Sequence, residues 1–301
     1  MINRKLNLDI PERITEFESL MKKLLVRKVL YKIVFRGKGL EFDSYRQFNS
    51  NDDASDIDWK ASRRSQDLLV KQYIEERDLK IMIVVDISDN MIFGSTNKLK
   101  CEYAAELAAT LGHMIVTSGD RLGFVMYSND TKKMSLPLPG MKQFYIFTDE
   151  LSNPTLYGGR AGFEHTLNFL LNYLEKSVSV VIFISDFMGL RKDIEKDLNL
   201  FARSFETIAL MVRDPLDSTL PNFKGELVLE DPITGEQIIV DPRVAKKSYE
   251  KYALEQEELV KDIFKETGID FLSLSTQDSF PQKLAEFLNS RVERRKYVVP
   301  R

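Results

Sequence analysis

Hydrophobic residues in the middle of the chain come in short, uninterrupted runs. Residues 81–85 are all apolar, and the run ends abruptly at Asp86. Residues 180–184 repeat the pattern and are followed by Ser185 and Asp186. Such runs are typical of strands buried on both faces of a parallel sheet. Because the carboxyl ends of parallel strands meet at one edge, where open α/β sheets bind ligands, we expect both aspartates to lie there.

Strand and helix patterns alternate from residue 80 to about residue 290. Besides the first run, strands are predicted at 122–127, 134–138, 179–185, 206–212 and 270–274. Helices are predicted at 99–116, 140–151, 163–176, 190–203, 243–267 and from residue 281 onward. This alternation predicts an α/β fold with a doubly wound, mostly parallel sheet.

The flanking residues are predicted to be appendages of this domain. Helical spacing of apolar residues at 11–35 predicts a helix that docks on it. Residues 36–79 are less regular and too few for a core of their own, so we expect them to pack on the main domain. Two β-rich runs around a Pro-Ile-Thr-Gly turn predict a hairpin inserted at 226–241. The predicted parts are therefore 1–79, 80–290 and a basic tail at 291–301.

Composition narrows the classes of function. The chain has 301 residues, of which 43% are hydrophobic and 30% charged, as in an ordinary globular protein. The net charge of -3 gives no general attraction to nucleic acid or to an anionic membrane. Apolar runs are too short for membrane insertion, so we expect a cytoplasmic protein. A single cysteine, Cys101, excludes an internal disulfide, and only two histidines argue against a His-rich zinc site.

The polar residues after the first run have the chemistry of a hard-metal site. Asp86, Ser88 and Asn90 alternate on what is predicted to be a tight turn, and Asp186 adds a carboxylate from the neighbouring loop. Carboxylate, hydroxyl and amide oxygens suit Mg²⁺ or Mn²⁺ better than zinc. These four residues are the candidate metal ligands.

The same residues resemble the metal-ion-dependent adhesion site of von Willebrand factor A domains. That motif is Asp-x-Ser-x-Ser after the first strand, a threonine in a middle loop and an aspartate after the fourth strand. Asp86, Ser88 and Asp186 stand in the corresponding places, but Asn90 replaces the second serine. Arg160, in Gly158-Gly159-Arg160, stands where the threonine is expected.

Arg160 has two incompatible positions available to it. A guanidinium about 4 Å from a divalent ion would be repelled by several kcal/mol even at an effective dielectric near 20. Either Arg160 faces solvent and the ion binds, or its guanidinium pairs with Asp86 and Asp186 in place of the ion. We expect weak or absent binding of Mg²⁺ or Mn²⁺.

Two further stretches resemble the prokaryotic domain-of-unknown-function family fifty-eight. They are the segment from Gly37 to Asp78, with its Asp58-Trp59 pair, and the hairpin sequence from Leu229 to Asp241. The resemblance implies no established reaction. It implies a partnership with a MoxR-type AAA+ ATPase and a client protein, because members of that family are typically encoded beside such ATPases.

Three functions remain open on these residues. The first, which we favour, is a non-enzymatic interaction module that binds its partner at a solvated edge formed by Ser88, Asp89, Asn90 and Asp186. The second is a metal-dependent phosphohydrolase with Asp86 as nucleophile, although Ser88 stands where such enzymes need an acidic residue. The third is a purely structural scaffold in which the aspartates cap helices or turns.

Overall fold

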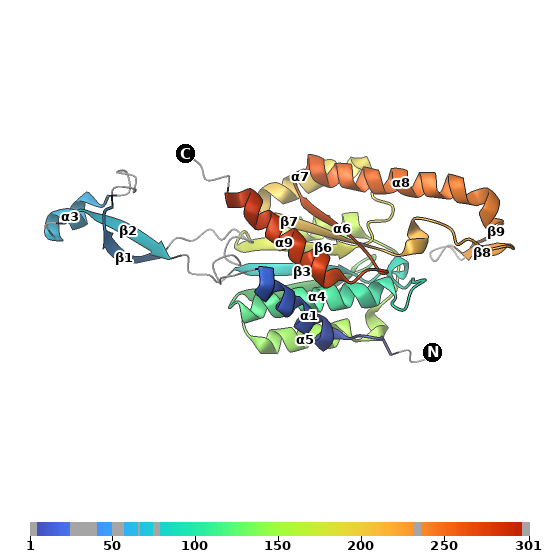
Figure 1. The fold of residues 1–301 in the computed structure, drawn as a ribbon, viewed down its shortest axis with the longest axis horizontal. Coiled ribbons are helices and arrows are strands. Elements are labelled where there is room, and N and C mark those ends of the chain that lie inside the picture. Colours follow the sequence, from blue (N-terminus) through green and yellow to red (C-terminus); the bar gives the residue numbers. More distant parts are fainter. Residues whose placement is uncertain are drawn as a thin grey trace. The chain divides into compact units, whose positions relative to one another are not determined.

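Six strands form the central sheet of the computed structural model (Figure 1). They are β3 (Lys80–Asp86), β4 (Arg121–Tyr127), β5 (Thr131–Leu138), β6 (Val178–Ser185), β7 (Glu206–Arg213) and β10 (Asp270–Ser275). Their spatial order is β10-β7-β6-β3-β4-β5, and every neighbouring pair is parallel except β4 and β5. The mostly parallel α/β sheet predicted from the sequence is confirmed.

The structure describes residues 5–24, 41–49, 57–65, 67–74, 79–230 and 236–296. The chain divides into two compact units. The larger unit comprises Met1–Arg36 together with Leu79–Arg301, and the smaller unit comprises Gly37–Asp78.

The apolar side chains of β3 belong to two hydrophobic cores, one on each face of the sheet. Successive side chains of a strand point to opposite faces of the sheet. Ile81 and Ile83 accordingly belong to one buried cluster, whereas Met82 and Val84 belong to the other. All four side chains are fully buried. A strand at the centre of a doubly wound sheet therefore needs no polar face, which explains the absence of alternation in its sequence.

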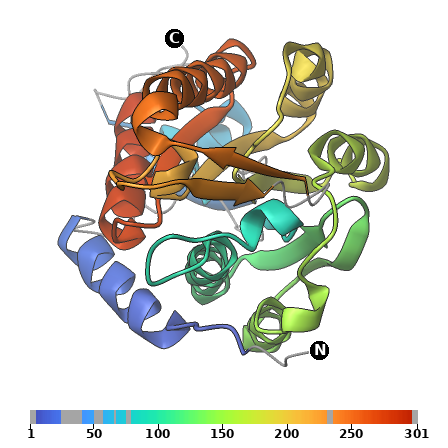
Figure 2. The same ribbon diagram turned by 90° about the vertical axis from the view of Figure 1, so that its right-hand side faces the viewer.

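Helices cover both faces of the sheet (Figure 2). The first core contains side chains from α1 (Ile10–Leu24), α4 (Lys100–Thr117), α5 (Met141–Leu151) and α9 (Phe280–Lys296). The second core contains side chains from α6 (Phe163–Tyr173), α7 (Glu195–Ser204) and α8 (Pro242–Glu266). Among the described residues, no helix has the length and apolar character that crossing a membrane requires.

The N-terminal helix packs within the larger unit. α1 lies against α4 and α9, and its Phe17 is 2% exposed. Glu106 of α4 accepts a hydrogen bond from the Asp9 backbone N–H at 2.6 Å, just before α1 begins. The helix was predicted over 11–35; its second half, from residue 25, lies outside the described residues.

The smaller unit contains β1 (Glu41–Gln47), α3 (Trp59–Ser65) and β2 (Leu69–Ile74). β1 and β2 form an antiparallel two-stranded sheet separate from the central one. Asp58 Oδ1 accepts hydrogen bonds from the backbone N–H groups of Lys60 and Ala61 at 3.0 and 3.1 Å, and so starts α3. The packing of residues 36–79 on the main domain stays a prediction.

Two boundaries near the C-terminus bear on the predicted parts. The inserted hairpin is present as β8 (Leu227–Glu230) paired antiparallel with β9 (Gln237–Val240). The predicted boundary at residue 290, in contrast, falls inside α9. Arg291 is 1% exposed and lies 3.0 Å from Asp270, so the first residue assigned to the basic tail is part of the folded unit.

Candidate functional site

The two predicted aspartates lie at the same edge of the sheet. β3 and β6 are parallel neighbours, with Val85 opposite Ile184, so Asp86 and Asp186 follow side by side. Both carboxylates are buried, at 2% and 1% exposure. The prediction that they meet at one edge is confirmed, but the expectation of a solvated edge is wrong for Asp186 and for Ser88, which has no exposed surface.

Asp86 is held by the backbone and by a hydroxyl. Its Oδ1 accepts a hydrogen bond from the Ser88 backbone N–H at 2.9 Å, and its Oδ2 accepts one from Ser185 Oγ at 2.6 Å. Burial, together with the nearby carboxylate of Asp186, raises the pKa of Asp86 to about 6. Both carboxylate oxygens are therefore already engaged.

Asp186 forms an ion pair with a buried lysine. Its Oδ1 accepts a hydrogen bond from the Met188 backbone N–H at 2.9 Å, and its Oδ2 lies 2.9 Å from Lys100 Nζ. The same ammonium lies 3.0 Å from Asp217 Oδ2. Lys100 is 2% exposed. Burial acts to lower the pKa of Lys100, but the charges of Asp186 and Asp217 outweigh it and raise that pKa.

A short helix, η5 (Pro215–Asp217), positions the second partner of Lys100. Asp217 Oδ2 accepts a hydrogen bond from the Asp214 backbone N–H at 2.8 Å. Asp214 in turn binds the loop that precedes α4, because its Oδ1 accepts from Ser95 Oγ at 2.5 Å and its Oδ2 accepts from the Ser95 backbone N–H at 2.8 Å. The lysine is thus fixed between two loops that are themselves tied together.

Lys100 and Asp217 were not predicted from the sequence. A signal existed for the loop that carries Asp217: β7 is a third apolar strand, and Asp214 stands directly after it as Asp186 stands directly after β6. No comparable signal marks Lys100, which opens α4 and resembles an ordinary surface lysine in the sequence.

The loop that contains Gly158 and Gly159 contacts the site through its backbone atoms. Gly159 O accepts a hydrogen bond from the Asp89 backbone N–H at 2.8 Å, and Gly158 N donates to Ile87 O at 2.7 Å. Both glycines have positive φ, 126° and 95°. Arg160 itself is exposed, with no hydrogen bond or ion pair to another described residue. Of the two positions considered for it, the structure has the one facing solvent.

A divalent ion does not fit the donors as they stand. The Lys100 ammonium lies 2.9 Å from Asp186 Oδ2, where a cation would meet that carboxylate, and each oxygen of Asp86 has one of its two lone pairs occupied by a hydrogen bond. Ser88 Oγ is buried and lacks a hydrogen-bond partner in the described part of the chain, but a single hydroxyl makes no site. No group of three or more His, Cys, Asp or Glu suited to a metal occurs among the described residues. The expected weak or absent Mg²⁺ or Mn²⁺ binding stays a prediction.

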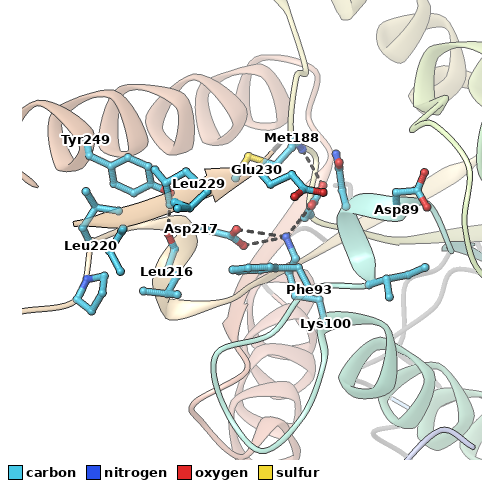
Figure 3. Close-up of a pocket in the computed structure, with 16 residues that line it drawn as sticks. Asp89, Phe93, Lys100, Met188, Leu216, Asp217, Leu220, Leu229, Glu230 and Tyr249 are labelled. Atoms are coloured by element: carbon cyan, nitrogen blue, oxygen red, sulfur yellow. Dashed lines mark hydrogen bonds and ion pairs between the residues drawn. The ribbon is translucent and has the colours of Figure 1, made fainter. Parts of the chain in front are cut away.

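An open cavity of about 680 Å³ adjoins this network (Figure 3). We call it the hairpin pocket, because β8 forms one wall of it. In Figure 3 the Lys100 nitrogen points to Asp217 on its left, Phe93 lies beside the lysine, Glu230 lies above it and Asp89 lies to its right. The residues around it are Asp89, Asn90, Ile92, Phe93, Lys100, Asp186, Met188, Leu216, Asp217, Leu220, Pro221, Leu227, Val228, Leu229, Glu230 and Tyr249.

Asp86 borders a different cavity. This second space, about 600 Å³, is lined by Asp86 and Ser185 and by polar residues of α6 and of the segment after β6, among them His165 and Arg191. The predicted ligands are therefore divided: Asn90 and Asp186 border the hairpin pocket, whereas Asp86 borders the second cavity.

Comparison with known proteins places these features in context. The model of the family described as "Protein of unknown function DUF58" matches residues 44–259. Uncharacterized proteins of Mycobacterium bovis and Mycobacterium tuberculosis are 27% identical over 260 residues, covering 85% of this chain and 80% of theirs.

Two solved structures with a TM-score of 0.50 share the fold, and a third match has a lower score. A conserved hypothetical protein, BatB, of Bacteroides thetaiotaomicron has a TM-score of 0.50 at 15% identity, covering 71% of this chain and 99% of its own. An aerotolerance-related membrane protein of Bacteroides fragilis also has a TM-score of 0.50 at 15% identity, with 72% and 99% covered. A von Willebrand factor type A protein of Catenulispora acidiphila has a TM-score of 0.39 at 10% identity, with 74% and 43% covered.

Proposed function

This chain belongs to the family described as protein of unknown function DUF58, and on that premise we propose that it is a non-enzymatic protein-interaction module. The proposed partner is a MoxR-type AAA+ ATPase, for which the chain acts in the cytoplasm as an adaptor that binds a client during assembly or remodelling. The partnership rests on the resemblance of the segment before the sheet and of the hairpin to that family.

The observation that carries the proposal is the buried ion pair beside an open apolar pocket. Lys100 Nζ lies 2.9 Å from Asp186 and 3.0 Å from Asp217, and the three side chains are 2%, 1% and 9% exposed. The ammonium of Lys100 is held by two carboxylates and its side chain is only 2% exposed, whereas the hairpin pocket next to it is open. This arrangement favours recognition over chemistry.

The geometry around Asp86 speaks against the phosphohydrolase. A nucleophilic carboxylate needs a free oxygen in line with the phosphorus atom. Asp86 has both oxygens hydrogen-bonded and is 2% exposed. Two residues further on, where a general acid is needed, Ser88 is fully buried.

We further propose that the module binds without a metal ion. In the adhesion site that the sequence resembles, a metal carries the positive charge at this edge. Here the ammonium of Lys100 supplies a fixed charge at Asp186 instead. Binding that survives treatment with EDTA is the expected behaviour.

Two assays on the full chain test the proposal. The immobilised chain is incubated with the purified MoxR-type ATPase, with and without nucleotide, and we expect the ATPase to be retained in at least one state. Absence of retention in every state contradicts the partnership. In parallel, p-nitrophenyl phosphate is offered with Mg²⁺ or Mn²⁺. Turnover that disappears in Asp86→Asn would establish the enzymatic alternative.

A further inference from the structure

We propose that the hairpin pocket binds an extended segment of a partner protein, which adds as a strand to β8 and carries apolar side chains and a lysine or arginine. This inference rests on the proposed function, because it names the chemistry that the interaction module recognises. Three observations support it: the apolar walls, the free edge of β8 and the balance of charge in the pocket.

Large apolar side chains line the pocket and are open to water. Ile92 is 43% exposed, Phe93 42% and Val228 59%. The wall opposite is fixed, since Tyr249 Oη donates to Leu216 O at 2.6 Å. Exposed apolar clusters of this kind mark binding surfaces, and a volume of about 680 Å³ is within the range of ligand pockets.

The strand β8 borders the pocket with its backbone. Alternate side chains of a strand point to opposite faces of the sheet. A strand that borders a pocket with one face would therefore line it with every second residue only. All four residues of β8, Leu227–Glu230, line the pocket. Within the described residues β8 pairs with β9 alone, so its other edge has no strand partner. An extended peptide is the ligand that such an edge accepts, through backbone hydrogen bonds.

The charges in the pocket select a basic segment. Four carboxylates line it, those of Asp89, Asp186, Asp217 and Glu230, against the single ammonium of Lys100. That ammonium is already bonded to Asp186 and Asp217. Among the described residues, neither Asp89 nor Glu230 has an ion-pair partner. Glu230 is exposed, and its Oε2 accepts a hydrogen bond at 2.6 Å from the neutral side chain of Gln237, which leaves the charge of Glu230 unbalanced. A guest cation finds two uncompensated carboxylates there, whereas an acidic segment is repelled.

Selection of peptides against the purified full chain tests this inference without the ATPase. A phage library of random 12-residue peptides is selected on the immobilised chain, and the enriched peptides are synthesised with a fluorescent label. We expect them to contain apolar residues with at least one Lys or Arg. Their affinity is then measured by fluorescence anisotropy for the wild type and for two charge variants.

The variants form a matched pair. Glu230→Lys reverses a charge in the pocket, whereas Glu226→Lys makes the same change four residues earlier, at an exposed position that does not line it. We expect about tenfold weaker binding for Glu230→Lys and no change for Glu226→Lys. Replacing alternate backbone amides of the peptide by N-methyl amides should abolish binding to the wild type, because these amides would no longer donate to β8.

Several results would overturn the proposal. They are enrichment of acidic peptides, equal loss in Glu226→Lys and Glu230→Lys, full binding of the N-methylated peptide, or no enrichment at all. Self-association of the wild type that Glu230→Lys abolishes would also overturn it, since the occupant of β8 would then be a second copy of this chain. The ATPase takes no part in the peptide selection. A negative result in the selection therefore does not affect the retention assay, which tests the proposed function separately.

Discussion

Replacing Lys100 by methionine removes the positive charge on which the buried network depends. Asp186 and Asp217 then face each other without a cation, with Asp86 also close by, and their side chains are only 1% and 9% exposed. Breaking a buried ion pair by removing one partner costs about 3–5 kcal/mol, because the remaining charge stays buried without compensation. We expect Lys100→Met to lower the free energy of unfolding by that amount.

The size of the loss should depend on pH. Acid protonates a buried carboxylate that has no cation beside it and so relieves the repulsion. The difference between wild type and Lys100→Met should therefore be smaller at about pH 5 than at about pH 8. Adding Asp186→Asn to the variant should recover part of the stability at the higher pH, because one of the unpaired charges is gone.

Urea unfolding followed by circular dichroism measures these differences. Lys142→Met is the matched control, since Lys142 is exposed on α5 and such surface changes stay within about 0.5 kcal/mol. A loss below about 1 kcal/mol for Lys100→Met, equal at both pH values, would refute the claim that Lys100 holds the carboxylates together.

Three further predictions concern Asp86, Arg160 and the smaller unit. The pKa of Asp86 is raised to about 6 in the folded chain, so its contribution is favourable below the unfolded value of 3.8 and is lost as pH rises through 6. Asp86→Asn should therefore flatten the wild-type fall in stability over this window, in urea titrations at stepped pH. Arg160→Thr should leave calorimetric titration with Mg²⁺ unchanged, because Arg160 faces solvent and Lys100 remains; tighter binding by the variant would contradict this. Limited proteolysis should leave the smaller unit joined to the larger one in a single resistant fragment that also keeps α1 and Arg291, since both are packed in the larger unit; early cleavage between 60 and 80 with both halves surviving would contradict the predicted packing.

The sheet and the meeting of the two aspartates could be predicted because both depend on local patterns. Residues 81–85 and 180–184 are apolar without alternation, which is the property of strands with a core on each face. Parallel neighbours then bring their carboxyl ends together whatever the connecting helices contain. The prediction that Asp86 and Asp186 lie at the same edge of the sheet required only these two facts.

The lysine at the centre of the site could not be predicted in this way. Lys100 meets Asp186 across 86 positions of sequence and Asp217 across 117, and neither separation leaves a pattern in a single sequence. Its place depends on how the loop before α4 is fastened to η5 through Ser95 and Asp214. The same loops bury Asp186, which is why the prediction of a solvent-exposed edge at this residue was wrong.

Arg160 illustrates a second limit. Aligning it with a metal-binding threonine assumes that the loop delivers a side chain to the site. The loop instead delivers backbone, since Gly159 O accepts a hydrogen bond from the Asp89 N–H and the arginine points away. Side-chain direction in a loop with two positive-φ glycines depends on backbone geometry that the motif does not specify.

Hydrogen exchange of the chain in the presence and absence of the MoxR-type ATPase tests the central claim most directly. If the chain is an interaction module that uses the hairpin pocket, addition of the ATPase, or of ATPase with client, should slow exchange in β8 and in the segment that contains Ile92 and Phe93. Exchange in the second cavity, around His165 and Arg191, should stay unchanged. Unaltered exchange in β8 under every nucleotide condition, or protection confined to the second cavity, would contradict the account.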